Sequence, residues 1–214
     1  MEIAILLFER LTALDAVGPY EVLSRIPDAK VLFVAKNPGA KRTDVGSLAL
    51  VAEYSLGEVT APDIVVIPGG PGQTALMDDQ PVLDWIRHVH QTTKWTTSVC
   101  TGSLVLGAAG LLKGLRATSH WLALDLLENF GAEPTAERVV IQGKIVTSAG
   151  VSSGIDMALT LVARECGESF AQAIQLGIEY DPQPPFDAGS PAKAPAAVVE
   201  LLRSRSRFII QGGE

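Results

Sequence analysis

The stretch at residues 95–110 constrains the fold of this chain more than any other, because a strand pattern there runs directly into a helix pattern. Trp95 to Val99 is short, apolar and β-branched, which predicts a buried strand. From Thr101 onward, leucine, valine and alanine mix with small glycines and predict a buried helix. Cys100 lies at the join. A sharp strand-to-helix turn pushes the side chain at its apex out above the sheet, as in a nucleophile elbow.

The position of Cys100 predicts a reactive thiol. Backbone N–H groups in the first turn of a helix favour an anion, and such a site lowers a thiol pKa into a range of roughly 3.5–7.5. We therefore expect Cys100 to be a nucleophile with a lowered thiol pKa. The alternative is a packed, unreactive cysteine, because free cysteine is among the most buried residue types. We expect Cys166, which ends an apolar run, to have that structural role.

The rest of the chain alternates between strand and helix patterns. Strands are expected at 2–8, 30–36, 48–52, 63–67, 95–99, 116–118, 138–142 and 144–147, the last two as a hairpin around Gly143. Helices are expected at about 16–26, 82–91, 101–111, 121–130, 155–166, 170–179 and 196–205, with Pro19 in a first turn and Ser119 as a cap. Such alternation predicts an α/β, doubly wound sandwich with a mostly parallel sheet, and we expect residues 1–214 to form one domain.

Composition and charge exclude several classes of protein. The net charge is −7, from 24 acidic and 17 basic side chains, and no long basic block is present, which argues against binding to nucleic acid or to an anionic membrane. The apolar N-terminus lacks a basic start, so it predicts a strand and not a signal peptide. No uncharged apolar run is long enough for a membrane span. Two cysteines without an export signal favour free thiols in the cytoplasm.

A proline-rich arm at residues 181–195 precedes the last expected helix. It contains Phe186, which has no apolar partner within its own segment. We expect the arm to pack over a neighbouring subunit across a dimer interface. A linker to a further domain is the alternative.

Several other residues are candidates for the site around Cys100. Asp15 follows the first strand, at the same sheet edge, as either a catalytic acid or a helix N-cap. Thr101 can supply one N–H of an anion hole and a hydroxyl, or can merely start the helix. Gly69 and Gly70 follow a buried strand and can supply a second N–H, or can form only a tight turn. They match neither the Walker nor the dinucleotide-binding pattern.

The histidines of this sequence do not predict a metal-binding site. His120 follows a short strand and can orient or deprotonate Cys100, but we favour a structural role. His88 and His90 are two positions apart on one helix, so they face different directions. No Cys/His cluster has metal-ligand spacing, and we expect neither a metal nor a cofactor.

Five segments together resemble the PfpI/ThiJ superfamily, relatives of the class I glutamine amidotransferases. They are Leu14–Pro19, Ile67–Gly70, Ser98–Leu112, Ala117–Trp121 and Gly150–Asp156. Within that superfamily, residues 185–191 and the following Ala-Pro-Ala resemble the C-terminal arm of the isonitrile (isocyanide) hydratases. The resemblance implies a flavodoxin-like homodimer with Cys100 as nucleophile and Asp15 as acid. We expect the substrate site to include Gly69, Gly70, His120, Gly150 and Val151.

Two departures from the wider superfamily favour hydration over peptide or amide cleavage. Thr101 stands where many PfpI-type proteases have histidine, and Asp15 stands where many members have glutamate. Cleavage chemistry needs a proton delivered to a leaving amine. The resemblance implies instead that water adds to an isonitrile through a Cys100 thioimidate, giving an N-substituted formamide. Asp15 alternates between acid and base, so no histidine is required.

Two other functions stay open. The domain also resembles the ligand-sensing half of AraC-type transcription regulators, although Arg203–Arg207 is too short to form their helix-turn-helix region. The third possibility is a redox or carbonyl-stress protein that uses Cys100 as a sensor or in glyoxalase-like chemistry.

Overall fold

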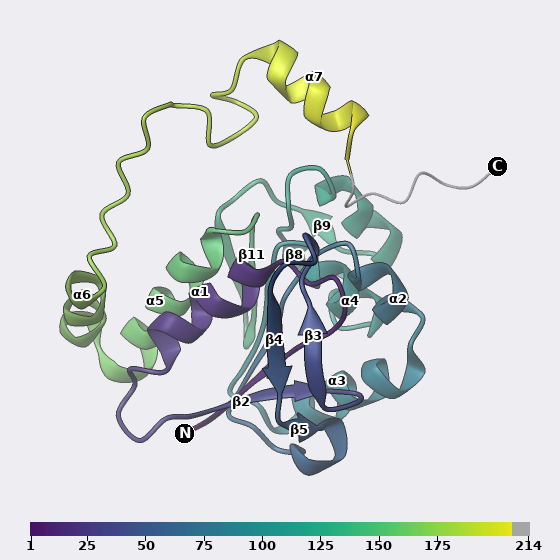
Figure 1. Ribbon diagram of the computed structural model, residues 1–214, viewed down its shortest axis with the longest axis vertical. Helices are drawn as coiled ribbons and strands as arrows, with labels where there is room; N and C mark the ends of the chain where they lie inside the picture. The colour runs from purple at the N-terminus through teal and green to yellow at the C-terminus, as the bar shows by residue number, and fades with distance from the viewer. Residues whose placement is uncertain (207–214) are drawn as a thin grey trace.

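A seven-stranded sheet forms the centre of the computed structural model, which describes residues 1–206 (Figure 1). Its order is β10-β11-β7-β6-β1-β2-β5. The strands are β1 (Glu2–Leu6), β2 (Lys30–Ala35), β5 (Tyr54–Ser55), β6 (Ile64–Ile67), β7 (Trp95–Val99), β10 (Val139–Gln142) and β11 (Ile145–Ser148). Neighbouring strands are parallel except β10 and β11, which form the predicted hairpin.

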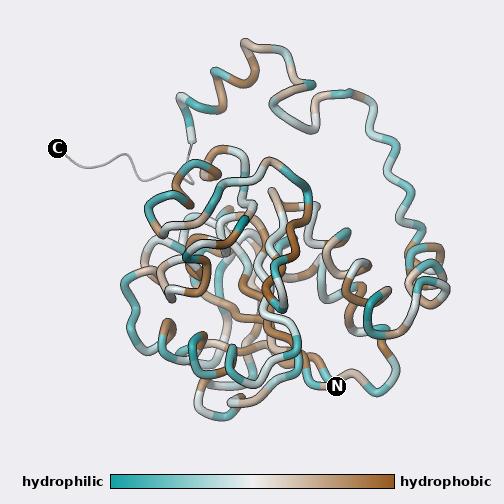
Figure 2. The backbone as a smooth tube through the Cα atoms, turned by 180° about the vertical axis from the view of Figure 1, so that it is seen from behind, coloured by the Kyte–Doolittle hydropathy of each residue, from teal (hydrophilic) through white to brown (hydrophobic). Residues whose placement is uncertain are grey.

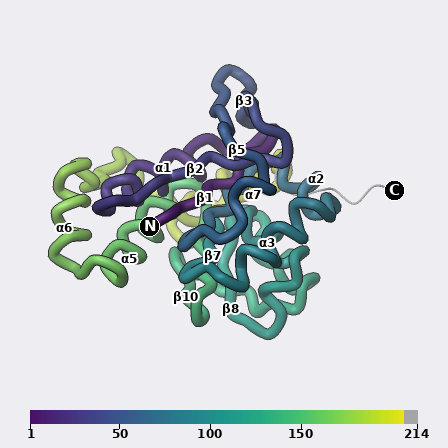
Figure 3. Tube along the Cα trace, turned by 90° about the horizontal axis from the view of Figure 1, so that it is seen from below, coloured from purple at the N-terminus to yellow at the C-terminus, as the bar shows by residue number. Residues whose placement is uncertain are grey.

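Helices cover both faces of this sheet, so the prediction of a doubly wound, flavodoxin-like α/β fold is confirmed. On one side α1 (Ala13–Leu23) packs against α5 (Ser153–Cys166), which also contacts α6 (Glu168–Gly177). On the other side α4 (Gly102–Ala108) contacts α2 (Gln73–Met77) and α3 (Gln80–Thr92). Figure 3 shows α2 and α3 on the opposite side of the molecule from α1, α5 and α6. Central strands buried on both faces have to be apolar throughout, as in Ile64–Ile67. Figure 2 shows the hydrophobic colour concentrated along the inner strands.

The strand order reverses between β1 and β6. From β1 the chain moves to β2 on one side, and it later returns to β6 on the other side. In open α/β sheets, ligands bind at such a switch point, outside the carboxyl ends of the strands. The segments that follow β1, β6 and β7 all begin at this edge, and they carry Asp15, Gly69 and Cys100.

A small antiparallel sheet beside the main one was only half predicted. The expected strand at 48–52 is β4 (Ala49–Ala52), and it pairs with β3 (Gly39–Arg42). The sequence of β3, Gly-Ala-Lys-Arg, has no apolar alternation that would predict a strand. Its residues are held instead by pairing with β4.

Two sequence predictions about helices are wrong. Residues 121–130 form a turn and then a 3₁₀ helix, η2 (Leu124–Phe130), and not one α-helix from Trp121. Its predicted cap, Ser119, donates its hydroxyl to the carbonyl of Cys100. Pro19 lies inside α1 and not in its first turn. The shorter elements are η1 (Leu56–Glu58), β8 (Arg116–Ala117) and β9 (Glu133–Pro134).

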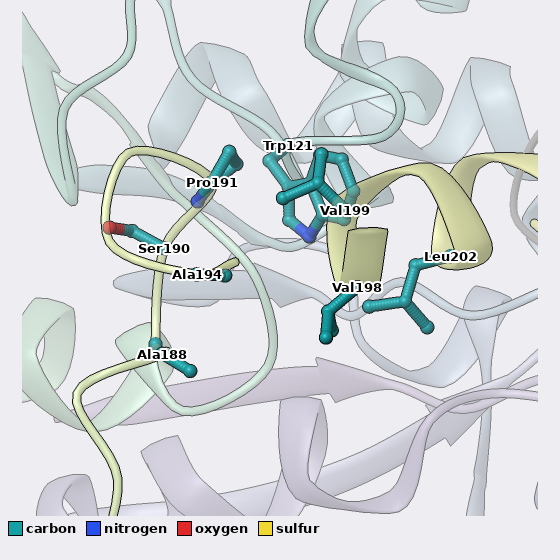
Figure 4. A pocket seen from close by; sticks show the side chains of 9 residues that line it. Trp121, Ala188, Ser190, Pro191, Ala194, Val198, Val199 and Leu202 are labelled. Atoms are coloured by element: carbon teal, nitrogen blue, oxygen red, sulfur yellow. The ribbon is translucent and has the colours of Figure 1, made fainter. Parts of the chain in front are cut away.

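The proline-rich arm extends away from α6 before the chain returns in α7 (Ala196–Ser204) (Figure 1). No residue of α7 is buried, and Phe186 is 77% exposed. The returning segment and Trp121 line a pocket, with the Trp121 ring beside Val199 (Figure 4). The Arg203 guanidinium lies 5.6 Å from the centroid of the same ring.

Cys166 is exposed at the end of α5, so its predicted place in the core is wrong. Both cysteines are free thiols, as expected. Within residues 1–206, no helix is both long and apolar enough to cross a bilayer.

We predict that Gly102→Ala destabilises the protein by about 2 kcal/mol or more, because α4 begins in close contact with the end of β6. A Cβ atom at Gly102 would overlap the carbonyl oxygen of Ile67 and lie 2.8 Å from that of Pro68. Chemical denaturation measures the loss. The matched control is Gly57→Ala, where an added Cβ meets nothing within 4 Å. Equal stability of the two variants would contradict the tight approach of α4 to β6.

Candidate active site

Cys100 occupies the apex of the turn between β7 and α4 in a conformation that non-glycine residues rarely adopt. Its φ of 57° lies in the left-handed region, where a side chain is strained. Four hydrogen bonds hold its backbone in place. Its N–H donates to the carbonyls of Ser148 (3.1 Å) and Ala149 (3.0 Å), and its carbonyl accepts the hydroxyls of Ser103 (3.1 Å) and Ser119 (3.2 Å). The predicted nucleophile elbow is therefore present in the structure.

Asp15 lies beside this thiol and is fully buried. Its Oδ2 accepts the N–H of Gly69 at 2.8 Å, whereas its Oδ1 has no nitrogen or oxygen partner within the described chain. Burial raises the pKa of the carboxyl to about 7, although the hydrogen bonds from Gly69 and Cys100 lower it in part. The negative charge of Asp44 raises it further. The carboxyl is thus able to exchange a proton near neutral pH.

Asp15 is the third residue of α1, so its alternative role as the helix N-cap is wrong. The N-cap is Thr12, whose backbone N–H donates to the Gly69 carbonyl at 2.9 Å. Loop contacts between α1 and the end of β6 therefore fix the first turn that carries the carboxyl.

The predicted lowering of the Cys100 thiol pKa is wrong for this structure. The thiol is fully buried, and burial raises its pKa well above the ordinary value. The charge of Asp15 raises it too, and together these outweigh the N–H groups of Val151 and Thr101, which favour the thiolate. Helix-terminal N–H groups lower a thiol pKa only when the cost of desolvation is smaller than their attraction. A thiol proton and an acceptor carboxyl thus lie side by side.

The backbone N–H groups of Gly69 and Gly70 both donate hydrogen bonds to residues of the site. Gly69 donates to Asp15, and Gly70 donates to the Thr101 hydroxyl oxygen at 3.0 Å. These N–H groups therefore hold Asp15 and Thr101 in position. The sequence suggested instead that one of them would be free to bind an anion. A Cβ at Gly69 would lie 2.5 Å from the Thr101 nitrogen, so only glycine fits there without a shift.

Gly150 and Val151 follow β11 beside the elbow, and His120 packs against Gly150. Val151 has a φ of 33°, and its N–H is directed to the Cys100 thiol. A Cβ at Gly150 would lie 2.7 Å from the His120 ring, so the ring packs directly on this glycine. His120 Nδ1 accepts the Leu122 N–H at 3.2 Å, and burial lowers the His120 pKa to about 4. The imidazole is therefore neutral at pH 7.

In the described part of the chain, no three His, Cys, Asp or Glu side chains are grouped as metal ligands would be. The Nδ1 of His90 lies 2.8 Å from the Thr96 hydroxyl, away from the site around Cys100.

Two residues that contribute to the site were not predicted from the sequence. Asp44 comes from the turn of the β3–β4 hairpin, and Ser103 gave no signal beyond a small polar residue in an apolar helix.

We predict that Asp15→Asn stabilises the protein above neutral pH. The pKa of Asp15 is raised from 3.8 to about 7, so the folded wild type binds an extra proton between these values and loses stability as pH rises through this window. Relative to Asp15→Asn, the full pH-dependent loss is roughly 4 kcal/mol. Denaturation at pH values from 3 to 9 measures it, with the exposed Asp125→Asn as control. If the difference in unfolding free energy between Asp15→Asn and the wild type did not change with pH, the raised pKa of Asp15 would be contradicted.

Comparisons with known proteins agree with this architecture. Residues 1–164 match the DJ-1/PfpI family. The isonitrile hydratase of Pseudomonas putida is 46% identical over 206 residues, which cover 96% of this chain and 90% of that protein. A crystal structure of a THiJ/PfpI family protein from Pseudomonas syringae has a TM-score of 0.93 and 40% identity, covering 97% of this chain and 86% of that one. The HTH-type transcriptional regulator CdhR of Pseudomonas aeruginosa is 37% identical over 92 residues, 42% of this chain and 27% of that protein. The chain described here belongs to the DJ-1/PfpI family.

Proposed function

We propose that this protein is an isonitrile hydratase, which adds water to R–N≡C and releases an N-substituted formamide. The observation that carries the proposal is the buried pair formed by the Cys100 thiol and the Asp15 carboxyl. The similarity over 96% of the chain to the Pseudomonas putida isonitrile hydratase supports the choice of substrate class.

The first step moves the thiol proton to the substrate carbon. The Asp15 carboxylate accepts the proton of Cys100, and the resulting thiolate forms an S–C bond to the terminal carbon of the isonitrile. Asp15 then gives the same proton to that carbon, which leaves Cys–S–CH=N–R. The pKa of about 7 suits a carboxyl that has to take and return a proton near neutral pH. Burial keeps competing water away from the thiolate.

The second step returns the enzyme to its starting state. The Asp15 carboxylate takes a proton from water, whose oxygen bonds to the thioimidate carbon, and the nitrogen receives that proton. As the C–S bond breaks, the hydroxyl proton of this adduct passes to the sulfur, which reforms the thiol and releases R–NH–CHO. One carboxyl serves both steps, so the neutral His120 is not needed as a base.

The burial of Cys100 weighs against the redox-sensor function. A redox sensor needs a low-pKa, accessible thiol, whereas Cys100 is fully buried with a raised pKa. Part of the segment Arg203–Arg207, whose sequence is too short for a helix-turn-helix region, lies outside the described residues. We include a reducing cytoplasm in the proposal, because the reaction requires a free Cys100 thiol.

We predict that Cys100→Ala and Asp15→Asn each lower formamide production from a simple alkyl isonitrile by about 10³-fold or more, since each removes one half of the pair. Gas or liquid chromatography of the formamide measures turnover. Cys166→Ala is the matched control and keeps full activity, because this thiol is exposed and far along α5. Near-normal turnover by Asp15→Asn would remove the acid/base assignment.

We further propose that the enzyme is a homodimer whose partner covers the arm and α7. The helix buries no residue in the single chain, and Phe186 and Leu201 remain 77% and 46% exposed. Single exposed apolar residues are ordinary, but a whole unburied helix with an apolar side needs a covering surface.

The double variant Phe186→Ser/Leu201→Glu is therefore expected to be a monomer under conditions in which the wild type is a dimer. Analytical ultracentrifugation distinguishes the two. Glu200→Gln, on the same helix, serves as a control that stays dimeric. A monomeric wild type at micromolar concentration would contradict the dimer.

A further inference from the structure

The turn of the β3–β4 hairpin reaches the segment that begins α1. Leu11 forms an isolated parallel β-bridge with Thr43, and the Asp44 N–H donates to the Leu11 carbonyl at 2.9 Å. The Arg10 N–H donates to the Arg42 carbonyl at 2.7 Å. These contacts join two segments about thirty residues apart and bring Asp44 to the start of the helix that carries the catalytic carboxyl.

The Asp44 carboxylate is held in a fixed orientation. Its Oδ2 accepts the Thr12 hydroxyl at 3.1 Å, and its Oδ1 accepts the Val45 N–H at 2.9 Å. Thr12 is the N-cap of α1, yet its hydroxyl makes no hydrogen bond to the helix. A threonine N-cap ordinarily stabilises a helix by about 1 kcal/mol through such a bond. Here the hydroxyl binds Asp44, a local departure of the kind found at functional sites.

The negative charge of Asp44 also raises the pKa of Asp15. The Asp15 N–H donates to the Thr12 carbonyl at 3.1 Å, so Thr12 contacts both acidic residues. From the elbow, the titratable group that faces Asp15 is the Cys100 thiol, and from the hairpin it is Asp44. The β6 loop contributes only the neutral N–H of Gly69. A second negative charge makes the Asp15 carboxylate a better acceptor for the thiol proton.

We propose that Asp44 is a positioning residue for the reaction: its carboxylate accepts hydrogen bonds from the Thr12 hydroxyl and the Val45 N–H and keeps a fixed negative charge beside Asp15. This inference rests on the proposed function for its catalytic meaning. The contact itself does not depend on which substrate the enzyme takes.

Two variants separate the charge from the geometry. Asp44→Asn removes the charge and keeps one oxygen that can accept the Thr12 hydroxyl, although its amide nitrogen cannot accept the Val45 N–H. Thr12→Val removes the hydrogen bond from Thr12 and keeps the charge. Asp44→Glu retains the charge and serves as the control should the asparagine variant fold poorly.

The experiment is a ¹³C NMR titration of carboxyl-labelled aspartate, with the Asp15 signal assigned by its absence in Asp15→Asn. We expect the Asp15 midpoint to fall by at least about 0.3 pH unit in Asp44→Asn and to stay near the wild-type value in Thr12→Val and Asp44→Glu. In Asp44→Asn, the acid limb of the pH profile of kcat/KM for an isonitrile is likewise expected to move to lower pH. An unchanged midpoint in Asp44→Asn, or an equal fall in Thr12→Val, would overturn the charge assignment. Because the titration uses no substrate, it decides this point even if isonitriles are not turned over.

Discussion

The buried contact between the Cys100 thiol and the Asp15 carboxyl is the interaction on which the rest of the site depends. Burial disfavours charge on either group and raises the pKa of both, and the charge of Asp15 raises the thiol pKa further. In the proposed reaction, one proton moves between the sulfur and the carboxyl oxygen of this pair. A reaction that needs a thiolate at one moment and an acid at the next can use that single proton.

The fold supplies this pair through three loops at one edge of the sheet. The loop after β1 brings Asp15, the turn after β6 brings Gly69 to bind its Oδ2, and the strained elbow after β7 brings Cys100. Such an arrangement costs stability, because a fully buried carboxyl and a left-handed cysteine are both unfavourable in themselves. The hydroxyls of Ser103 and Ser119 offset part of that cost by binding the Cys100 carbonyl.

Sequence patterns predicted the features that depend on local periodicity and chain order. Apolar runs such as Ile64–Ile67 predicted the parallel strands, and the rule that loops share the carboxyl edge predicted that Asp15 lies near Cys100. Features that depend on tertiary burial were not accessible. The thiol pKa was expected to be low because the helix terminus could be inferred, whereas the desolvation that outweighs it could not. The hairpin strand β3 and the contact of Asp44 with Thr12 gave no local signal, since both depend on partners far along the chain.

In the proposed mechanism, Cys100 bonds covalently to the substrate carbon during turnover. Mass spectrometry of the wild-type enzyme, quenched rapidly in acid while an alkyl isonitrile is being consumed, detects this bond. We expect the protein to gain the mass of one intact isonitrile, and peptide mapping to place it on Cys100. Formamide production with no adduct on Cys100, or with an adduct on another residue, would contradict the mechanism.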